Sequence, residues 1–457
     1  MLDEKNIIKR EFIINSLKKL ILEETGKEKV FSGIKINSKE IKKGNIFLAL
    51  KGEKEDGHSY INEAIKNGAT GIITEKALNE EQLSIFYVQD SILALQEIAK
   101  NWKEQYKNIV TIGITGSVGK TTTKQFTEKI LSSEYNTIAP IKNFNNEIGL
   151  PLTMLKINNK TEILILEMGM YQRGDIAQLA EIAQPDHGII TNIEAVHLER
   201  AGSIKNIFLA KKELIDALPA NGLAILNNDD EKLRKMINTE KRKIISFGVN
   251  KKSDIHAKNI IDNGLKGFKF DLFIKNQFTG TLKIKQPGIH LLPSLLASIA
   301  IGNYFQVSPK KIKLSLEKFL LEDRLQVINK KNNITIIDDT YNSSPSSVIG
   351  ALKLLDKATN YKIAILGDMR ELGKMTKQNH KNIGEIAAQN ADEIICLGRD
   401  AKDIYIGSKK NTTKKVFHFE NTEQLLNYVN KQKFNNATIL VKGSRALKME
   451  DIVRQIK

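Results

Sequence analysis

The sequence has little cysteine, tryptophan or arginine, and it has no long apolar run. Its one cysteine, Cys396, cannot form an internal disulfide, and its place in the apolar segment EIICLG predicts a small buried side chain rather than a nucleophile. No stretch of about 18 apolar residues occurs, and the beginning MLDEKNIIKREF is charged throughout. We therefore expect a cytoplasmic protein with neither a membrane-spanning helix nor a secretory signal.

Acidic residues are too few to balance the basic ones, which leaves a formal charge of +17. A strong positive charge can indicate nucleic-acid binding, because clustered Lys and Arg release counterions from phosphate backbones. Here 60 of the 70 basic residues are lysine, they are spread along the chain, and aromatic residues do not interleave with them. We interpret the charge as a solvated surface without a nucleic-acid site, one that would speed the arrival of anionic substrates.

The length of 457 residues exceeds the roughly 250 to 300 over which one hydrophobic core grows, and 41% apolar residues can fill more than one core. We find no internal repeat and no low-complexity linker. Changes in pattern place the domain boundaries near residues 105 and 320. The predicted domains are 1–105, 106–320 and 321–457.

Apolar β-branched segments alternate with helix-like segments through most of the chain, which predicts an α/β fold. We expect a small α/β domain first, then a central phosphate-loop domain with a mostly parallel sheet flanked by helices, then a Rossmann-like domain. Between 253 and 287 the segments KGFKFDLFI and GTLKIK alternate apolar and polar residues, which favours a short antiparallel addition. Ligands are expected at the carboxyl ends of the parallel strands.

The segment GITGSVGKTTTK lies between the strand-like NIVTIGIT and a helix-forming stretch, where phosphate-binding loops occur. Its glycines allow backbone N–H groups to approach phosphate oxygens, Lys120 offers an ammonium to the terminal phosphates, and Thr121 offers a hydroxyl to Mg²⁺. Ile114 replaces the first glycine of the usual pattern, so the loop is a short form. The residues predicted to contact a nucleotide here are Gly116, Ser117, Gly119, Lys120, Thr121 and Thr122.

This short loop resembles that of the Mur ligases, ATP-dependent amide-forming enzymes of peptidoglycan synthesis, and further motifs follow in the family's order through nearly the whole chain. The segment NFNNEIGLPLTML is similar to the family's Asn-rich stretch, which implies substrate contacts by Asn145 and Asn146. Glu167 and His197 each end an apolar strand. Either alone would suit an ordinary surface position, but carboxylate with imidazole is a reasonable pairing for a hard cation. The resemblance implies that they bind Mg²⁺ together with Thr121.

Two further positions take their interpretation from the family. Lys211, in FLAKKELI, stands where these ligases carry a carbamoylated lysine, which implies a carboxylate that helps to hold a second Mg²⁺. Without the resemblance, Lys211 would be a solvated helix lysine. The segment PGIHLLPSLLASIAIG resembles the stretch that packs on adenine. It keeps His290, but Leu291 and Ser294 replace the usual asparagines.

The last third of the chain is similar to the branch of the family that adds D-alanyl-D-alanine. The resemblance implies that Arg324 reaches the ATP phosphates, that Asp339 lies near the ribose, and that Tyr341 and Asn342 bind substrate. Ser343-Ser344 replaces the Ala-Asn of the motif. The segments GDMRELG, with its downstream His380, and VKGSR complete the signature; their predicted substrate contacts are Asp368 and Ser444.

The first domain has a segment that resembles the family's grip on the uridine nucleotide, INSKEIKKGNIFLALKGEKEDGHSY. Ser38 is kept and is expected to contact this substrate. The usual motif Asp-Ser-Arg is here Asn37-Ser38-Lys39, so the planar guanidinium fork that would bind a phosphate in a bidentate manner is absent.

Taken together, the resemblance implies an ATP- and Mg²⁺-dependent ligase for UDP-N-acetylmuramoyl-tripeptide and D-alanyl-D-alanine that works as a monomer through an acyl phosphate. Catalysis would depend on Lys120, Lys211, His197 and Arg324. Two alternatives stay open. One is the ligase that adds the third amino acid to the dipeptide precursor, and the other is a non-catalytic nucleotide-binding relative, suggested by the departures at 37, 39, 294 and 344.

Overall fold

The computed structural model describes residues 7–52, 55–78, 80, 83–196, 198–250, 252–410 and 414–456. These residues form two compact units. The first unit contains the residues up to 113 together with 135–170 and 175–187, and the second contains 114–134, 171–174 and the residues from 188 onwards. The division passes through two strands, β8 (Val110–Thr115) and β11 (His187–Ile190).

The first unit contains a five-stranded sheet whose core is apolar on the side of helix α2 (Ile61–Lys66). The strand order is β2 (Ile21–Thr25), β7 (Ser84–Val88), β6 (Gly71–Thr74), β5 (Ile46–Leu48) and β4 (Ile34–Lys35). All neighbours are parallel except β2, which runs antiparallel to β7. The small α/β fold expected for this part of the chain is confirmed.

The rest of the first unit is mainly helical. The predicted amphipathic helix is α3 (Ser91–Glu104), which begins where the Asp90 carboxylate accepts the backbone N–H groups of Ile92 and Leu93. Its apolar face is buried, and Trp102 donates its indole N–H to the carbonyl of Ile157 at 3.1 Å. The other elements are β1 (Ile8–Lys9), α1 (Arg10–Ser16), β3 (Val30–Phe31), η1 (Ser38–Glu40), η2 (Gly57–Tyr60), β9 (Thr137–Ile138), α5 (Gly149–Met154), β10 (Ile163–Glu167) and α6 (Asp175–Ala183).

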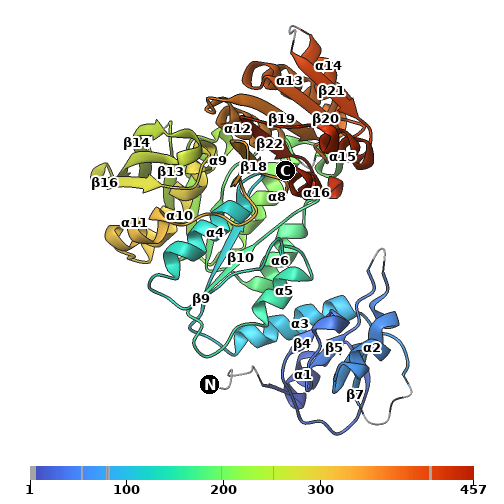
Figure 1. Ribbon diagram of the computed structural model, residues 1–457. Coiled ribbons are helices and arrows are strands. Elements are labelled where there is room, and N and C mark those ends of the chain that lie inside the picture. The colour runs from blue at the N-terminus through green and yellow to red at the C-terminus, as the bar shows by residue number, and fades with distance from the viewer. Residues whose placement is uncertain are drawn as a thin grey trace. The chain divides into compact units, whose positions relative to one another are not determined.

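The earlier part of the second unit contains the phosphate-loop helix and an antiparallel sheet extension. Strands β12 (Leu223–Asn227), β13 (Lys243–Gly248) and β14 (Ile255–Asp262) are parallel, and β15 (Phe268–Ile274) and β16 (Gln277–Ile284) continue the sheet as antiparallel hairpins. The expected antiparallel addition is therefore confirmed (Figure 1). The helices are α4 (Lys120–Leu131), α7 (Leu198–Ala201), α8 (Ile204–Asp216), α9 (Glu231–Ile237), α10 (Leu292–Tyr304) and α11 (Pro309–Glu317), with η3 (Gly264–Lys266) and η4 (Ile289–Leu291).

Helix α10 holds the phosphate-loop helix α4 in place. It is apolar around most of its circumference and is buried on nearly every side, as expected for a central core helix. Its Ser298 hydroxyl donates to the carbonyls of Thr123 and Ser294 and accepts a hydrogen bond from Thr127. These buried hydrogen bonds between the two helices help to fix the orientation of α4.

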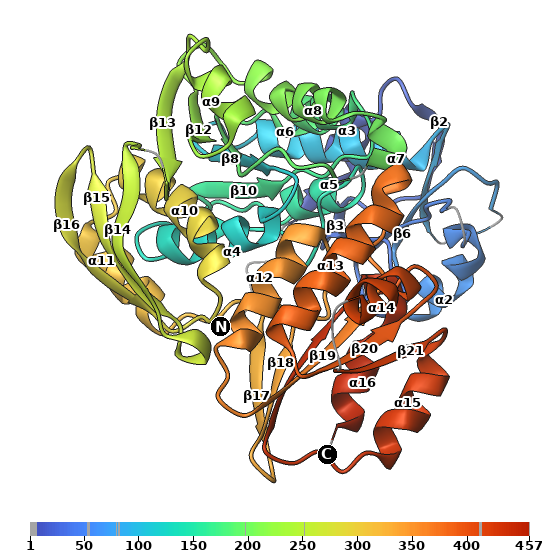
Figure 2. The same cartoon turned by 90° about the horizontal axis from the view of Figure 1, so that it is seen from above.

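The later part of the second unit is a doubly wound six-stranded sheet. Its order is β17 (Gln326–Lys330), β18 (Ile334–Asp338), β22 (Ala437–Lys442), β19 (Tyr361–Gly367), β20 (Glu393–Leu397) and β21 (Lys415–Phe419), and only β17 is antiparallel to its neighbour. Helices α12 (Pro345–Asp356), α13 (Thr376–Asn390) and α14 (Lys402–Lys409) cover one face, and α15 (Thr422–Lys431) and α16 (Glu450–Gln455) cover the other (Figure 2). Two short turns complete it, η5 (Gly373–Met375) and η6 (Arg445–Leu447).

Two sequence predictions about the interior can be checked here. Cys396 lies in β20 with no exposed surface, and burial raises the pKa of its thiol, so it is a core residue as predicted. Within the described residues, no helix combines the length and the hydropathy needed to cross a membrane.

Helices α13 and α14 approach each other closely because each places a glycine at the contact. A Cβ at Gly384 would lie 2.1 Å from the carbonyl oxygen of Ile404, and one at Gly407 would lie 2.1 Å from that of Lys381. These atoms belong to backbone, so they cannot turn aside as a flexible side chain would. The packing of this face of the sheet therefore requires glycine at both positions.

We predict that Gly384→Ala lowers the free energy of unfolding by about 1–3 kcal/mol, because the helices must separate to admit the methyl group. Denaturant unfolding followed by circular dichroism measures the change. Gln389→Ala is the matched control on the same helix, since Gln389 is exposed and should change stability by less than about 0.5 kcal/mol. Equal stability of Gly384→Ala and the control would contradict the close approach.

Candidate functional site

The glycine loop lies between β8 and α4, as the sequence predicts, and its glycines have backbone conformations that other residues rarely adopt. Gly116 has φ of 151° and Gly119 has φ of 88°. A Cβ at Gly116 would lie 1.8 Å from the Thr191 hydroxyl oxygen, and one at Gly119 would lie 2.7 Å from that of Ser294. The loop thus depends on glycine both for its torsion angles and for close contact with its neighbours.

Hydrogen bonds join this loop to the segment that follows β11. The Ser117 hydroxyl donates to the carbonyl of Glu194 at 3.0 Å and accepts the N–H of Glu194 at 2.9 Å. The backbone N–H of Val118 donates to the Asn192 side chain at 2.9 Å, and its carbonyl accepts the Thr191 hydroxyl at 2.6 Å. Seven polar groups of these two loops therefore satisfy one another.

Lys120 brings positive charge to the loop. Lys120, the first residue of α4, bends over the loop and donates from Nζ to the carbonyls of Gly116 at 2.8 Å and Ser117 at 3.3 Å. Thr121 and Thr122 follow it in the first helical turn, where N–H groups point toward a bound anion. The six loop residues predicted to contact a nucleotide thus lie at one strand-to-helix turn, whereas the other three predicted contacts, His290, Arg324 and Asp339, lie elsewhere in the second unit.

Lys211 lies on α8 and has no exposed surface, so its interpretation as a solvated helix lysine is wrong. Its Nζ has no hydrogen-bond partner among the described residues. Burial lowers the pKa of this ammonium well below its usual value, and the charge of Lys120 lowers it further. A buried amine that favours the neutral form is the result.

In the first unit, Glu167 and Asn145 form a separate polar pair. Glu167 ends β10 and is 1% exposed; its Oε1 accepts the Asn145 side-chain amide at 2.8 Å, whereas its Oε2 has no hydrogen-bond partner within the described chain. The carbonyl of Asn145 also accepts the N–H of Gly169 at 2.8 Å. Asn146 is exposed, and its side chain accepts the N–H of Gly149 at the start of α5.

The predicted metal ligand His197 lies outside the described residues. Among the residues that are described, no group of three or more His, Cys, Asp or Glu side chains is arranged to hold a metal ion. The unpartnered oxygen of Glu167 is nevertheless a buried anionic donor of the kind that a hard divalent cation prefers. The donor chemistry therefore fits Mg²⁺ at this position.

His290 lies in the turn η4, with its ring against helix α12. A Cβ at Gly350 would lie 2.4 Å from the ring, so this glycine allows the contact. Burial lowers the pKa of His290 to about 4, although the carboxylate of Asp339 acts in the opposite direction. The imidazole is neutral at physiological pH, which suits packing against an uncharged aromatic base.

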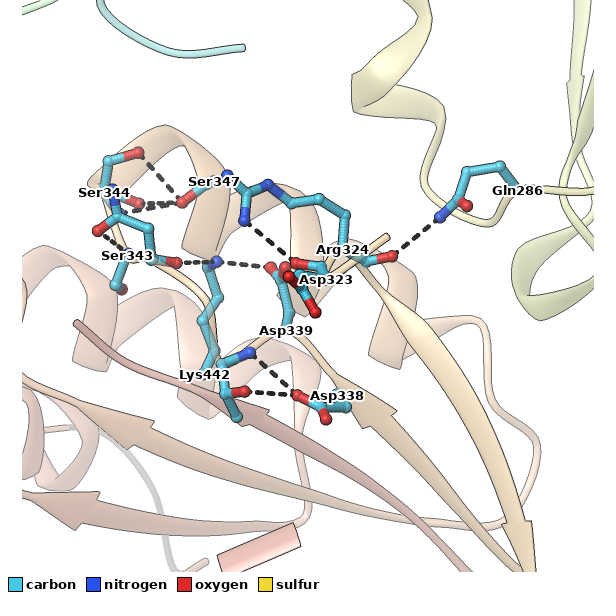
Figure 3. A network of polar contacts seen from close by, with 11 residues as sticks. Gln286, Asp323, Arg324, Asp338, Asp339, Ser343, Ser344, Ser347 and Lys442 are labelled. Atoms are coloured by element: carbon cyan, nitrogen blue, oxygen red, sulfur yellow. Dashed lines mark hydrogen bonds and ion pairs between the residues drawn. The ribbon is translucent and has the colours of Figure 1, made fainter. Parts of the chain in front are cut away.

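Three predicted residues, Asp339, Tyr341 and Asn342, follow the carboxyl end of β18, and the neighbouring strand β22 ends at Lys442. Asp339 and Lys442 are labelled in Figure 3. The buried Lys442 ammonium lies 2.5 Å from an oxygen of Asp339 and donates to the carbonyl of Asn342 at 2.8 Å. Burial lowers the pKa of Lys442, and the Asp339 carboxylate opposes that shift. The sequence analysis did not single out Lys442, because a lysine at the end of an apolar strand carries no signal of its partner.

Arg324 stands at the edge of this network. Its guanidinium carbon lies 4.2 Å from the centre of the Tyr341 ring, and its Nη1 donates to the carbonyl of Asp323 at 3.1 Å. Stacking of a guanidinium on an aromatic face holds its orientation while leaving other N–H groups for an anion.

The altered motif residues Ser343 and Ser344 lie at the start of α12. The N–H of Ser344 donates to the Ser347 hydroxyl at 3.0 Å, which is a helix-capping contact (Figure 3). Ser346, the residue before Ser347, donates from its hydroxyl to the Glu194 carboxylate at 2.6 Å. Burial raises the pKa of Glu194. This pair could not be predicted from the sequence, because the two residues are 152 positions apart in the chain.

The two remaining segments of the signature bind each other. The Asp368 carboxylate accepts the N–H of Ala401 at 2.7 Å, and its carbonyl accepts the Ser444 hydroxyl at 2.6 Å. His380 is buried; its Nε2 accepts the N–H of Met369 at 2.9 Å, so Nδ1 carries the proton and donates to a carbonyl. Asp368 and Ser444, predicted to bind substrate, thus have partners within the fold.

In the first unit, Ser38 is buried and donates to the Glu63 carboxylate at 2.7 Å. The departure Asn37 has a local role, since its side chain accepts the N–H of Lys39 at 3.1 Å and caps η1. Asn37, Ser38 and Lys39 therefore keep the compact turn of the segment that resembles a uridine-nucleotide grip.

Comparison with known proteins extends over the whole chain. Models of the Mur ligase family, catalytic domain, of the Mur ligase middle domain and of the Mur ligase, glutamate ligase domain match residues 30–111, 114–302 and 323–445. The UDP-N-acetylmuramoyl-tripeptide--D-alanyl-D-alanine ligase of Buchnera aphidicola subsp. Baizongia pistaciae is 37% identical over 421 residues, which are 90% of this chain and 89% of the relative.

Solved structures give the same result. MurF from Acinetobacter baumannii superposes with a TM-score of 0.88 at 27% identity and 98% coverage of both chains. The MurF ligase of Thermotoga maritima in complex with ADP superposes with a TM-score of 0.80 at 29% identity, covering 93% of this chain and 96% of that chain. With an ordered set of motifs, three family models and a relative of 37% identity, the chain belongs to the Mur ligase family.

Proposed function

We propose that the chain is the ATP-dependent ligase that joins D-alanyl-D-alanine to UDP-N-acetylmuramoyl-tripeptide during the synthesis of peptidoglycan precursors. The Buchnera relative carries this activity in its name and is covered over 89% of its length. The structural observation that carries the proposal is the glycine loop with Lys120 and, close enough for their charges to interact, the buried Lys211. Substrates of this kind argue for the cytoplasm as its compartment.

ATP is the proposed source of energy, which the ADP bound by the Thermotoga relative supports. The terminal phosphorus of ATP would be attacked by a carboxylate oxygen of the tripeptide, so that an O–P bond forms while ADP leaves. The amine of D-alanyl-D-alanine would then attack the carbonyl carbon of the acyl phosphate, and inorganic phosphate would leave as the amide forms and the amine loses a proton. Lys120 and Arg324 would offset the charge on the transferring phosphoryl group.

Four residues are proposed to hold Mg²⁺: Thr121, Glu167 and His197 would bind one ion, and carbamoylated Lys211 would help to hold a second. When bound, the ions would supply Lewis-acid stabilisation of the phosphate oxygens. The unpartnered Glu167 oxygen supports its part in this set. The remaining binding assignments stay proposals that follow the family's motifs: Asn145 and Asn146 for substrate, His290 for adenine and Asp339 for ribose.

The surroundings of Lys211 support its proposed carbamoylation. Only a neutral amine can attack the carbon of CO₂, and burial favours that form. Attack followed by loss of one proton converts the amine into a carbamate anion. The modification would therefore replace a buried amine that favours its neutral form with an anion that attracts a divalent cation.

The rival functions are less well supported. A ligase for the third amino acid would not need the D-alanyl-D-alanine signature, whose segments here bind each other through Asp368, Ser444 and His380. A non-catalytic relative was suggested by residues that depart from the motifs. Ser344 and Asn37, however, cap helices, and Ser294 lies against Gly119, so these departures have roles in the fold.

Phosphate release tests the proposed reaction. With Mg²⁺, ATP and UDP-N-acetylmuramoyl-tripeptide, we expect release on addition of D-alanyl-D-alanine and none on addition of single amino acids. Release only when UDP-N-acetylmuramoyl-dipeptide and a diamino acid are supplied would favour the rival ligase. No release with any acceptor would favour the non-catalytic relative.

We predict that Lys120→Ala lowers kcat by about 100-fold or more, because the transferring phosphoryl group loses a positioned positive charge. Lys129→Ala on the same helix is the matched control, since Lys129 is exposed and lies two turns beyond the loop. Steady-state ligation rates at saturating substrates measure both variants. Full activity of Lys120→Ala would remove the mechanism.

We predict that Lys211→Met abolishes ligation yet raises the free energy of unfolding by about 1–3 kcal/mol in CO₂-free buffer, because it removes a buried polar amine that must lose its proton or its hydration on folding. The pH dependence has a defined sign. The folded-state pKa of Lys211 is lowered, so wild-type stability rises with pH between that value and the unfolded value of about 10.4. The stability of the Lys211→Met variant should lack this contribution to the rise with pH.

Urea unfolding at several pH values measures the stability effect, and ¹³C NMR in ¹³C-bicarbonate detects the carbamate directly. Lys212→Met is the control at the neighbouring position, since the Lys212 side chain is partly exposed and paired with Asp216. A Lys211→Met protein that is less stable than wild type and keeps the same pH slope would contradict the burial of an unpartnered charge.

A further inference from the structure

The segment Leu321–Leu325 carries Arg324 but belongs to no helix or strand. Asp323 and Leu325, on either side of the arginine, have φ of 54° and 46°. Left-handed torsion angles are costly for residues other than glycine and persist only where the surroundings hold them. Groups outside this segment must therefore hold it in place.

Gln286 is one of them, and its side chain is almost wholly buried, with 1% exposure. Its Oε1 accepts the N–H of Leu321 at 2.8 Å. Its Nε2 donates to the carbonyl of Arg324 at 3.3 Å, the contact drawn in Figure 3. Burial of a carboxamide is unfavourable unless its hydrogen bonds are made. Here the amide makes them mainly with the two ends of the arginine segment.

Gln125 is the second. Its Oε1 accepts the N–H of Glu322 at 2.8 Å, and its Nε2 donates to the carbonyl of the same residue at 3.2 Å. Gln125 lies on α4 four residues after Thr121, so the two side chains share a face of the helix that begins at the glycine loop. A third glutamine, Gln326, donates to the carbonyl of Leu321.

These side-chain amides make the backbone hydrogen bonds that a neighbouring strand would make in a sheet. They occupy both backbone groups of Leu321 and of Glu322, together with the carbonyl of Arg324. The guanidinium is held separately by the Tyr341 ring. Backbone and side-chain tip of Arg324 are therefore fixed by different groups.

We propose that Gln125 and Gln286 are positioning residues that fix Arg324 relative to the phosphate loop. The proposal rests on the proposed function, in which Arg324 acts on the ATP phosphates. Gln125 connects the arginine segment to the helix that begins with Lys120. Helix α4 therefore helps to set the positions of both Lys120 and Arg324. Holding a group in its reacting position removes an entropic cost that a free linker would add to every turnover.

Steady-state kinetics of the full-length variants Gln125→Met and Gln286→Met test the role. Methionine keeps the length of the side chain but has no amide. We expect kcat/KM for ATP to fall about five- to tenfold in each variant, with KM for D-alanyl-D-alanine unchanged. Gln424→Met is the control, because Gln424 is exposed on α15.

A second comparison separates positioning from general damage. In an Arg324→Ala background, Gln125→Met and Gln286→Met should cause no further loss, since the group they position is gone. Losses that add fully to that of Arg324→Ala would overturn the proposal.

Amide hydrogen exchange tests the contacts without reference to activity. The amides of Leu321 and Glu322 should exchange faster in Gln286→Met and Gln125→Met respectively, and at the wild-type rate in Gln424→Met. Unchanged exchange at both amides would overturn the proposal. If these amides exchange faster in the two variants but the wild-type protein does not ligate D-alanyl-D-alanine, the proposed function is overturned and the contacts are still established.

Discussion

The hydrogen-bonded connection between the glycine loop and the loop after β11 is the constraint on which the rest of the second unit depends. Gly116 has no side chain, so Thr191 can approach the loop, and Ser117 then binds both backbone groups of Glu194. The Glu194 carboxylate continues the connection to Ser346 at the start of α12. One series of contacts thus leads from the proposed phosphate site to the segment that resembles a substrate motif. A displacement of the glycine loop would therefore change the position of the start of α12.

Two buried lysines show how the same side chain can serve different purposes. Lys442 has a carboxylate and a carbonyl as partners, so its charge is compensated and it organises the turn that contains Tyr341 and Asn342. Lys211 has no hydrogen-bond partner among the described residues, and its pKa is lowered by burial and by another cation. Full burial of an ionisable group without compensation favours its neutral form. The first lysine therefore suits a structural role, and the second suits covalent modification.

The residues that depart from the family's motifs are integrated into the fold. Ser294 lies against Gly119, since a Cβ at that glycine would be 2.7 Å from its hydroxyl oxygen, and Ser344 contributes to the cap of α12. Asn37 likewise caps a short helix in the first unit. Each replacement has a local hydrogen bond or a close contact that accounts for a small polar residue. These departures are therefore compatible with the activity of the relatives and do not by themselves indicate its loss.

The sequence was enough to predict the α/β class, the glycine loop, the amphipathic helix α3, the antiparallel strands β15 and β16, and the burial of Cys396. These features arise from short-range patterns: periodicity, β-branched runs and glycine spacing. It could not show that Lys211 is buried, that Glu194 meets Ser346, that Lys442 pairs with Asp339, or that Gln125 and Gln286 hold the arginine segment. Such pairs join residues that are distant in the chain, and only tertiary packing determines which polar groups lose water and which partners replace it.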